Sequence, residues 1–172
     1  TSMVVIREYR DSDRESVGFL IADTFAEANL SFAPPEQRAR FLGPFQHARS
    51  RDPAHQEAIA AVIRAPMVFV AEEDGRVVGV LRGGRQDRLQ SLFVAGDHQR
   101  RGIGRQLVER FERESLARGA TVIRLASTLY GVPFYLAMGY VKSRGQHLGS
   151  SFEGHGLPIQ PMKKVLGRPA DD

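Results

Sequence analysis

Residues 92–105 read Leu-Phe-Val-Ala-Gly-Asp-His-Gln-Arg-Arg-Gly-Ile-Gly-Arg and carry the strongest structural signal in the chain. The apolar residues at the start are typical of the end of a β-strand, and the polar residues after them predict a loop. Gly102 and Gly104 then open an amphipathic segment, 103–117, whose apolar residues recur at helical spacing. The free N–H groups in the first turn of a helix that starts this way favour a bound anion.

Positive charge is concentrated around the same stretch. Seven arginines and two aspartates lie between Arg76 and Arg105, which gives this window a net charge of +5 in a chain whose total is +4. A compact patch suits a compact anionic ligand, whereas a long polyanion usually meets a broader basic face. Phe93 is the only aromatic residue in the window, so interleaved stacking residues are missing. The sequence therefore predicts a phosphate site and no nucleic-acid partner, and a nucleic-acid-binding module is the disfavoured alternative.

The glycine pattern differs from two common phosphate-binding motifs. The segment lacks the Gly-Lys-Ser/Thr of a P-loop, which argues against hydrolysis of nucleoside triphosphates. Leu107 stands where the third glycine of Gly-x-Gly-x-x-Gly would be, which argues against a dinucleotide-binding fold.

Length and composition limit the architecture and the class of protein. A chain of 172 residues with 42% hydrophobic residues is long enough for one compact domain, which we expect over 3–168. The absence of cysteine excludes disulfides, zinc ribbons and a cysteine nucleophile. No apolar run approaches the ~18 residues that a membrane span needs, and the first ten residues lack a signal-peptide pattern. We expect a cytoplasmic protein without a membrane partner.

The periodicity along the chain predicts an α/β (α+β) fold with the order strand, helices, three strands, helix, strand, helix, two strands. The Asp74-Gly75 pair marks a tight hairpin turn. Gly-rich residues 145–157 predict a loop, and Pro161 predicts an edge or a bulge in the last strand. The expected strands are 4–7, 67–72, 77–81, 88–94, 121–126, 140–142 and 159–166, and the expected helices are 16–28, 36–47, 53–64, 103–117 and 132–138.

Two blocks resemble one known family. Gln99-Arg100-Arg101-Gly102-Ile103-Gly104 is similar to the Gln/Arg-x-x-Gly-x-Gly/Ala signature of the GNAT acyltransferase (N-acetyltransferase) superfamily. Residues 131–140, Gly-Val-Pro-Phe-Tyr-Leu-Ala-Met-Gly-Tyr, resemble its Ala-x-x-Phe-Tyr-x-x-x-Gly-Phe block, with Gly131 where the family often has alanine. The resemblance implies a GNAT-like mixed, mostly antiparallel central sheet of six to seven strands flanked by about four helices.

The resemblance also implies acetyl-CoA as cosubstrate. Strand residues 92–94 would pair with the pantetheine arm, a splayed sheet would make room for the thioester, and residues 99–105 would hold the pyrophosphate. Thr128 stands where the family often has an asparagine that contacts CoA, so the contact from this side chain stays open. The implied cofactor-binding residues are Leu92, Phe93, Val94, Gln99, Arg100, Arg101, Gly102, Ile103, Gly104, Arg105 and Thr128.

The implied reaction is direct transfer of an acetyl group to the amine of a small molecule or peptide, with Tyr135 as the general acid that protonates the CoA thiolate. The sequence does not single out a base: the candidates are Glu72, Glu73, Asp74, His47, His55, and Gln90 with Ser91 through ordered water. Substrate recognition would come from 25–64 and 144–158, where Phe25, Phe32, Phe41 and Phe45 could line an apolar pocket.

Three further expectations concern partners and activity. The five histidines lack metal-ligand spacing, so we expect no metal. Homodimers are common in the family, but no residue here demands one. The alternative to an enzyme is a catalytically silent acyl-CoA-binding or regulatory domain on the same fold.

Overall fold

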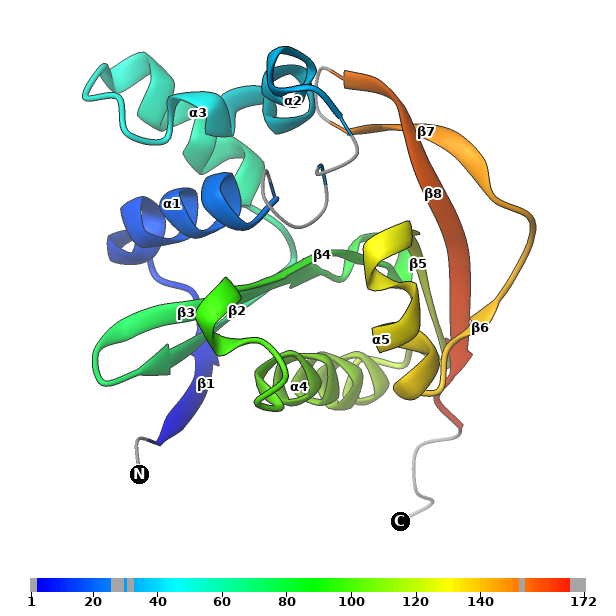
Figure 1. Ribbon diagram of the computed structural model, residues 1–172. Helices are drawn as coiled ribbons and strands as arrows, with labels where there is room; N and C mark the ends of the chain where they lie inside the picture. The colour runs from blue at the N-terminus through cyan, green and yellow to red at the C-terminus, as the bar shows by residue number, and fades with distance from the viewer. Residues whose placement is uncertain (1–2, 26–29, 31–32, 152–153, 168–172) are drawn as a thin grey trace.

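The computed structural model describes residues 3–25, 30, 33–151 and 154–167, which form a mixed α/β fold with two antiparallel four-stranded sheets (Figure 1). The strands of the first sheet lie in the order β1-β2-β3-β4, and β8 is the centre of the second, between β5 on one side and β6 and β7 on the other. Their bounds are β1 Val4–Glu8, β2 Met67–Glu73, β3 Arg76–Gly83, β4 Leu89–Val94, β5 Val122–Thr128, β6 Val141–Lys142, β7 His147–Ser151 and β8 Gly154–Val165.

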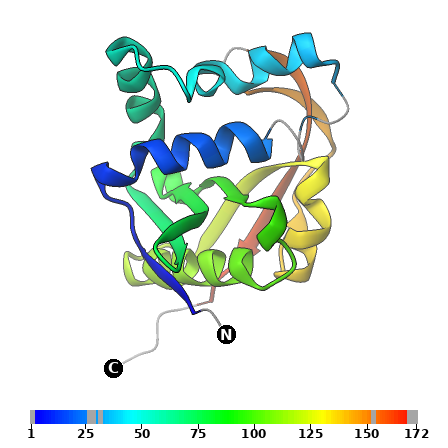
Figure 2. The ribbon, with the colours of Figure 1, turned by 60° about the vertical axis from the view of Figure 1, so that its left-hand side comes forward.

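The described residues contain five α-helices, and two of them, α1 (Arg14–Thr24) and α4 (Ile103–Ala117), pack on opposite faces of the first sheet (Figure 2). Alternation along β2 explains this arrangement, because Val70 packs with one group of helices and Phe69 with the other. The first group is α1 (Arg14–Thr24), α2 (Pro35–Leu42) and α3 (Pro53–Ile63); the second is α4 (Ile103–Ala117) and α5 (Val132–Ala137). Two hydrophobic cores therefore share one sheet.

The expectation of one sheet of six to seven strands is wrong. β4 and β5 meet at a single parallel bridge, Arg88 to Arg124, and the two sheets separate beyond it. A parallel pair that diverges in this way leaves one edge of β4 without a neighbouring strand. The hairpin through Asp74 and Gly75 is as expected, with φ of 51° and 78° in the tight turn.

The helix expected over 36–47 is interrupted. α2 ends at Leu42, and a 3-10 helix, Gly43–His47, follows it. Gly43 has φ of 52°, a conformation that ends an α-helix, and Pro44 cannot continue the α-helical hydrogen bonds. Residues 26–28 of the first expected helix lie outside the described residues.

The loop expected at 145–157 is also corrected, because β7 and the start of β8 form a hairpin there. The glycines serve close packing: a Cβ on Gly149 would lie 2.7 Å from Ile159 Cδ1, and one on Gly154 would overlap the Phe41 ring. Ser151 Oγ donates a hydrogen bond to the Phe41 carbonyl at 3.0 Å, which ties the hairpin to α2. The hairpin thus closes over the first group of helices (Figure 1).

Pro161 lies in the central strand β8, not at an edge. It is opposite Ala126 of β5, and its carbonyl accepts from Ser143 N on the other side at 3.0 Å. Because the N and C=O of a strand residue face the same way, the missing N–H of Pro161 also faces Ser143. On that side β8 passes from β6 to β7, so the proline removes no bond from the β5 ladder.

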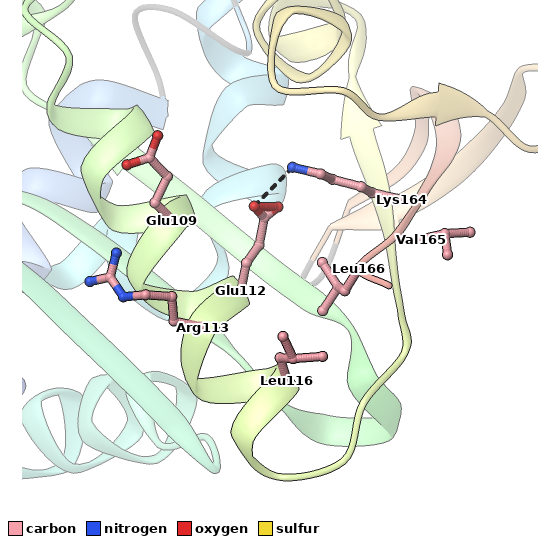
Figure 3. A pocket seen from close by; sticks show the side chains of 7 residues that line it. All are labelled: Glu109, Glu112, Arg113, Leu116, Lys164, Val165 and Leu166. Atoms are coloured by element: carbon pink, nitrogen blue, oxygen red, sulfur yellow. Dashed lines mark hydrogen bonds and ion pairs between the residues drawn. The ribbon is translucent and has the colours of Figure 1, made fainter. Parts of the chain in front are cut away.

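A shallow hollow of about 290 Å³ lies between α4 and the end of β8 (Figure 3). Lys164 Nζ donates to Glu112 Oε1 at 3.0 Å, and the buried Tyr140 hydroxyl donates to Glu112 Oε2 at 3.1 Å. These contacts hold β8 on α4. None of the helices in the described residues has the length and hydropathy that crossing a bilayer requires.

Candidate functional site

A cavity of about 770 Å³ occupies the space where β4 and β5 separate. One end, here called the loop end, is formed by α5 and by His98, Gln99, Arg100, Gly102, Gly104 and Arg105. The opposite end, here called the hairpin end, is formed by α1, the start of β4 and the β7–β8 hairpin. The hairpin end is lined by Thr24, Phe25, Arg82, Gln90, Ser91, Ser150, Ser151, Leu157 and Ile159.

The open edge of β4 presents backbone groups to this cavity. Ala95 N donates to Val78 O at 2.9 Å, and Phe93 is the register partner of Val80, so residues 91, 93 and 95 direct their backbone groups to β3. Leu92 and Val94 alternate with them and face the cavity. The side chain of Phe93 points to the first group of helices, where it makes a T-shaped contact with Phe25 at 5.5 Å.

The first turn of α4 leaves its N–H groups uncapped. Gly102 is the N-cap residue, with φ of 80°, and it has no side chain that could accept a hydrogen bond. Within the described part of the chain, no partner accepts from the N–H groups of Ile103, Gly104 or Arg105. Gly104 has a different role, because a Cβ there would lie 3.2 Å from Phe134 Cζ of α5. The helix therefore presents three donors and its positive dipole end to the cavity.

The three predicted arginines lie in different environments. Arg100, with φ of 64°, and Arg105 line the cavity. Arg101 instead donates to Glu73 Oε2 at 2.7 Å and is not among the residues that line the cavity. The Arg101 guanidinium, followed by His98, lowers the pKa of the Glu73 carboxyl. Two of the three positive charges thus face the site, and the third ties the loop to the β2–β3 hairpin.

Gln99 and Thr128 also line the cavity. The Gln99 side chain donates to Val94 O at 3.2 Å and accepts from the Tyr130 hydroxyl at 2.8 Å, so it links the end of β4 to the segment after β5. Thr128 is the last residue of β5, opposite Ile159. The side chain of Gln99 is therefore occupied by protein partners.

Tyr135 is buried on α5 and lines the cavity. Its ring packs edge-on against Phe134 at 5.1 Å and Tyr140 at 5.6 Å. No hydrogen-bond partner of its hydroxyl is found among the described residues. Burial raises the pKa of the Tyr135 phenol above its ordinary value, which keeps the group protonated at neutral pH. Tyr135 is therefore a neutral phenol in the wall of the cavity.

His98 is a cavity residue that the sequence did not reveal. It is buried, with Nδ1 2.8 Å from Asp97 Oδ1 and Nε2 3.1 Å from Glu73 Oε1. Its hydrogen bond lowers the pKa of the Asp97 carboxyl. Glu73 is 25 residues away in the sequence, and no local spacing signals such a contact.

Most of the candidate bases are occupied elsewhere. Glu72 accepts from Arg7 at 2.6 Å, and Asp74 is in the hairpin turn. His47 and His55 stack on each other with ring centres 4.0 Å apart, and neither lines the cavity. Of the sequence candidates, the residues that reach the cavity are Gln90 and Ser91.

Of the phenylalanines expected to form an apolar pocket, some lie in the core and one lines the cavity. Phe41 and Phe45 belong to the buried core, whereas Phe25 is both buried and part of the cavity wall; Phe32 lies outside the described residues. Across the described residues, no group of three or more acidic or histidine side chains is arranged to hold a metal ion.

Comparisons with known proteins point in one direction. A family model described as an acetyltransferase (GNAT) domain matches residues 43–166. The acetyl transferase GW6a of Oryza sativa subsp. japonica is 32% identical in a match of 142 residues that covers 67% of this chain and 34% of that relative. This chain thus spans about a third of that relative's length.

Solved structures share the fold. A GCN5-related N-acetyltransferase from Rhodopseudomonas palustris has a TM-score of 0.79 at 21% identity, covering 95% of this chain and 96% of that one. PaiA N-acetyltransferase from Thermoplasma acidophilum, in complex with coenzyme A, has a TM-score of 0.70 at 16% identity, covering 95% and 99%. YncA from Salmonella typhimurium, with its cofactor acetyl-CoA, has a TM-score of 0.63 at 20% identity, covering 99% and 98%.

Proposed function

The chain belongs to the GNAT acetyltransferase family, and from this premise we propose that it is an N-acetyltransferase that transfers an acetyl group from acetyl-CoA to the amine of a small molecule or peptide. The observation that carries the proposal is the cavity between β4 and β5, which runs from the uncapped end of α4 past Tyr135 to the hairpin end. The family implies an acyltransferase, and we propose the class of acceptor and the roles of the individual residues.

The loop end fits the phosphates of acetyl-CoA. The N–H groups of Ile103, Gly104 and Arg105 and the dipole of α4 would bind the pyrophosphate, and Arg100 and Arg105 would add positive charge. The backbone groups of Leu92 and the N–H of Val94, which have no strand partner among the described residues, would pair with the amides of the pantetheine arm. These groups are already directed into the cavity, so binding needs no new arrangement of the loop.

Acetyl-CoA supplies an activated thioester, whose carbonyl carbon is attacked by a neutral amine nitrogen and whose C–S bond then breaks. The Tyr135 hydroxyl would give its proton to the departing sulfur. Its place in the wall of the cavity and its lack of another partner in the described residues support this role. The amine must lose a proton, and Gln90 and Ser91 could hold the water that receives it, since they are the base candidates that line the cavity.

Isothermal titration with acetyl-CoA, followed by an amine panel with detection of the released thiol, tests this function. We expect binding in the range of tens of micromolar or tighter and acetyl-CoA-dependent release of thiol with at least one amine. No binding would overturn the proposal. Binding without transfer to any amine would instead favour the catalytically silent acyl-CoA-binding domain.

A further inference from the structure

The hairpin end of the cavity contains a half-buried cation, Arg82, that the acetyl-transfer chemistry does not use. Arg82 projects from β3, and its register partner is Ser91 on β4. Both face the first group of helices, as do Val80 and Phe93. The guanidinium lines the wall of the cavity that lies away from the loop end.

Three of the five N–H groups of the Arg82 guanidinium have protein partners. Nε donates to Ile63 O at 3.1 Å, Nη2 donates to Val62 O, and Nη1 donates to Ser91 Oγ at 3.2 Å. Because a guanidinium has five N–H groups, one remains on each terminal nitrogen. Two donors on adjacent nitrogens are the number that a carboxylate accepts from in a two-point contact.

The charge of Arg82 is not neutralised by an acid within the described residues. Its nearest acceptors are neutral oxygens, two of them the last carbonyls of α3, and no carboxylate forms an ion pair with it there. Burial lowers the pKa of the guanidinium, which reflects the cost of holding the charge away from water. An anion arriving beside Arg82 would offset that cost.

The described part of the hairpin end carries no acidic side chain. None of the described residues that line the cavity is an aspartate or glutamate, so none of them offers a counter-charge to the additional ammonium groups of a polyamine. The remaining wall is apolar or weakly polar, with Phe25, Leu157 and Ile159 beside Ser150 and Ser151. An acceptor that fits has an apolar portion and one negative charge.

We infer that Arg82 recognises a carboxylate on the acceptor. The substrate class is then the free amino carboxylates, such as an apolar amino acid, rather than polyamines or the side-chain amines of peptides. This rests on the proposed function. Arg82 then determines specificity: it fixes the carboxylate on the wall next to Ser91, and the amine of the same molecule is directed along β4.

A matched set of acceptors tests the inference. Leucine, leucinamide and 3-methylbutylamine share one side chain and differ in the carboxylate. We expect kcat/KM to be at least about tenfold higher for leucine, the value of one charge-assisted contact. The amide amine is less basic, so more of it is neutral at the assay pH, and this bias works against the expected result. Equal or better turnover of the two acceptors without a carboxylate would overturn the inference.

Two variants separate recognition from support of α3. In Arg82→Met, we expect KM for leucine to rise about tenfold, with kcat and KM for acetyl-CoA within about threefold and kcat/KM for 3-methylbutylamine unchanged. Arg85→Met is the matched control, because Arg85 is exposed, belongs to the same basic window and does not line the cavity. An equal loss for both acceptors in Arg82→Met would mean that Arg82 only holds α3, and would overturn the inference.

A measurement on the unaltered protein covers the case in which Arg82→Met does not fold. N-acetylleucine should inhibit at least about tenfold more strongly than N-acetyl-3-methylbutylamine against the acceptor. Equal inhibition would overturn the inference while acetyl transfer to other amines left the proposed function intact. No binding of acetyl-CoA and no release of thiol would overturn both the inference about Arg82 and the proposed function.

Discussion

Burial of a single hydroxyl, that of Tyr135, determines how the proposed proton donor should behave. Tyr135→Phe removes the proton donor but keeps the ring contacts with Phe134 and Tyr140. We expect kcat to fall about a hundredfold and the Kd of acetyl-CoA to stay nearly unchanged, because the hydroxyl acts on the leaving sulfur. Steady-state kinetics and titration measure the two. Tyr9→Phe is the control, since Tyr9 packs against the other core; an unchanged kcat in Tyr135→Phe would remove Tyr135 from the mechanism.

The pH profile provides a second readout at this residue. Burial raises the pKa of Tyr135, so the protonated, donating form persists above the ordinary tyrosine range and is lost only as the pH rises through that higher value. The kcat profile should therefore lack an alkaline decline below about pH 10. A decline near neutral pH that disappears in Tyr135→Phe would contradict this assignment.

The arginines of the loop should differ in their effect on affinity. Arg100→Ala removes a charge that lines the cavity, so we expect the Kd of acetyl-CoA to rise roughly fivefold, about 1 kcal/mol, and less so at high salt. Arg101→Ala removes the partner of Glu73, and we expect a change in Kd below about twofold. Titration at two salt concentrations compares them. A larger effect of Arg101→Ala would mean that its side chain turns to the phosphates.

At the level of elements, the turn from β5 to α5 is tightly packed at Gly131. A Cβ there would lie 2.8 Å from Ser127 Oγ, which donates to Thr128 O at 2.7 Å. Gly131→Ala should lower the free energy of unfolding by about 1–2 kcal/mol, and Ser127→Ala in the same chain should recover part of it because it removes the overlapping atom. Denaturant unfolding of the parent protein, the two single variants and the double variant measures the coupling free energy between Gly131 and Ser127. Gly96→Ala, with open space at its Cβ, is the control; additive effects would contradict the contact.

The open edge of β4 gives a prediction about neighbouring amides. Leu92 and Val94 direct their N–H groups into the cavity, whereas the N–H of Phe93 faces β3. Acetyl-CoA should slow amide hydrogen exchange at Leu92 and Val94 and leave Phe93 nearly unchanged, as measured by NMR. Phe93 is an internal control within the same strand. Equal protection of all three amides would indicate general tightening of the sheet and not pairing along this edge.

The sequence predicted most elements because their signals are local. The helix after Gly102, the turn at Asp74-Gly75 and the strands of the first sheet follow from periodicity and turn chemistry. β7 and the start of β8 were missed because Gly149 packs against Ile159 and Gly154 packs against Phe41, which is distant in the sequence. Pro161 was misplaced because the break between β6 and β7 that accommodates it depends on tertiary structure.

For the site, the sequence identified the motif but not which of its side chains line the cavity and which pair with other parts of the protein. Nine of the eleven expected cofactor-binding residues line the cavity, and Arg101 and Ile103 do not. The pairing of Arg101 with Glu73 is a contact over 28 positions. His98 and Arg82 were not singled out, because their importance arises from burial and from partners on other strands.

At the scale of the whole molecule, the separation of the two sheets should make acetyl-CoA a global stabiliser. A ligand that fills the cavity contacts β4 of one sheet and β5 of the other, which otherwise meet at one bridge. At a concentration of a hundred times Kd, binding to the folded state contributes about 2.7 kcal/mol, which corresponds to a rise in Tm of roughly 5–10 °C for a chain of this length. Differential scanning fluorimetry measures it.

Two control ligands make the same experiment specific for the phosphates. S-acetyl-N-acetylcysteamine has the thioester without phosphates and should raise Tm by less than about 1 °C at the same concentration, because the donors of the α4 N-terminus and Arg100 stay unused. A DNA duplex should not raise Tm, since the positive charge is confined to one window. A larger rise in Tm with DNA than with acetyl-CoA would mean that the basic window binds a polyanion, and the cavity between the sheets would then not be assigned to acetyl-CoA.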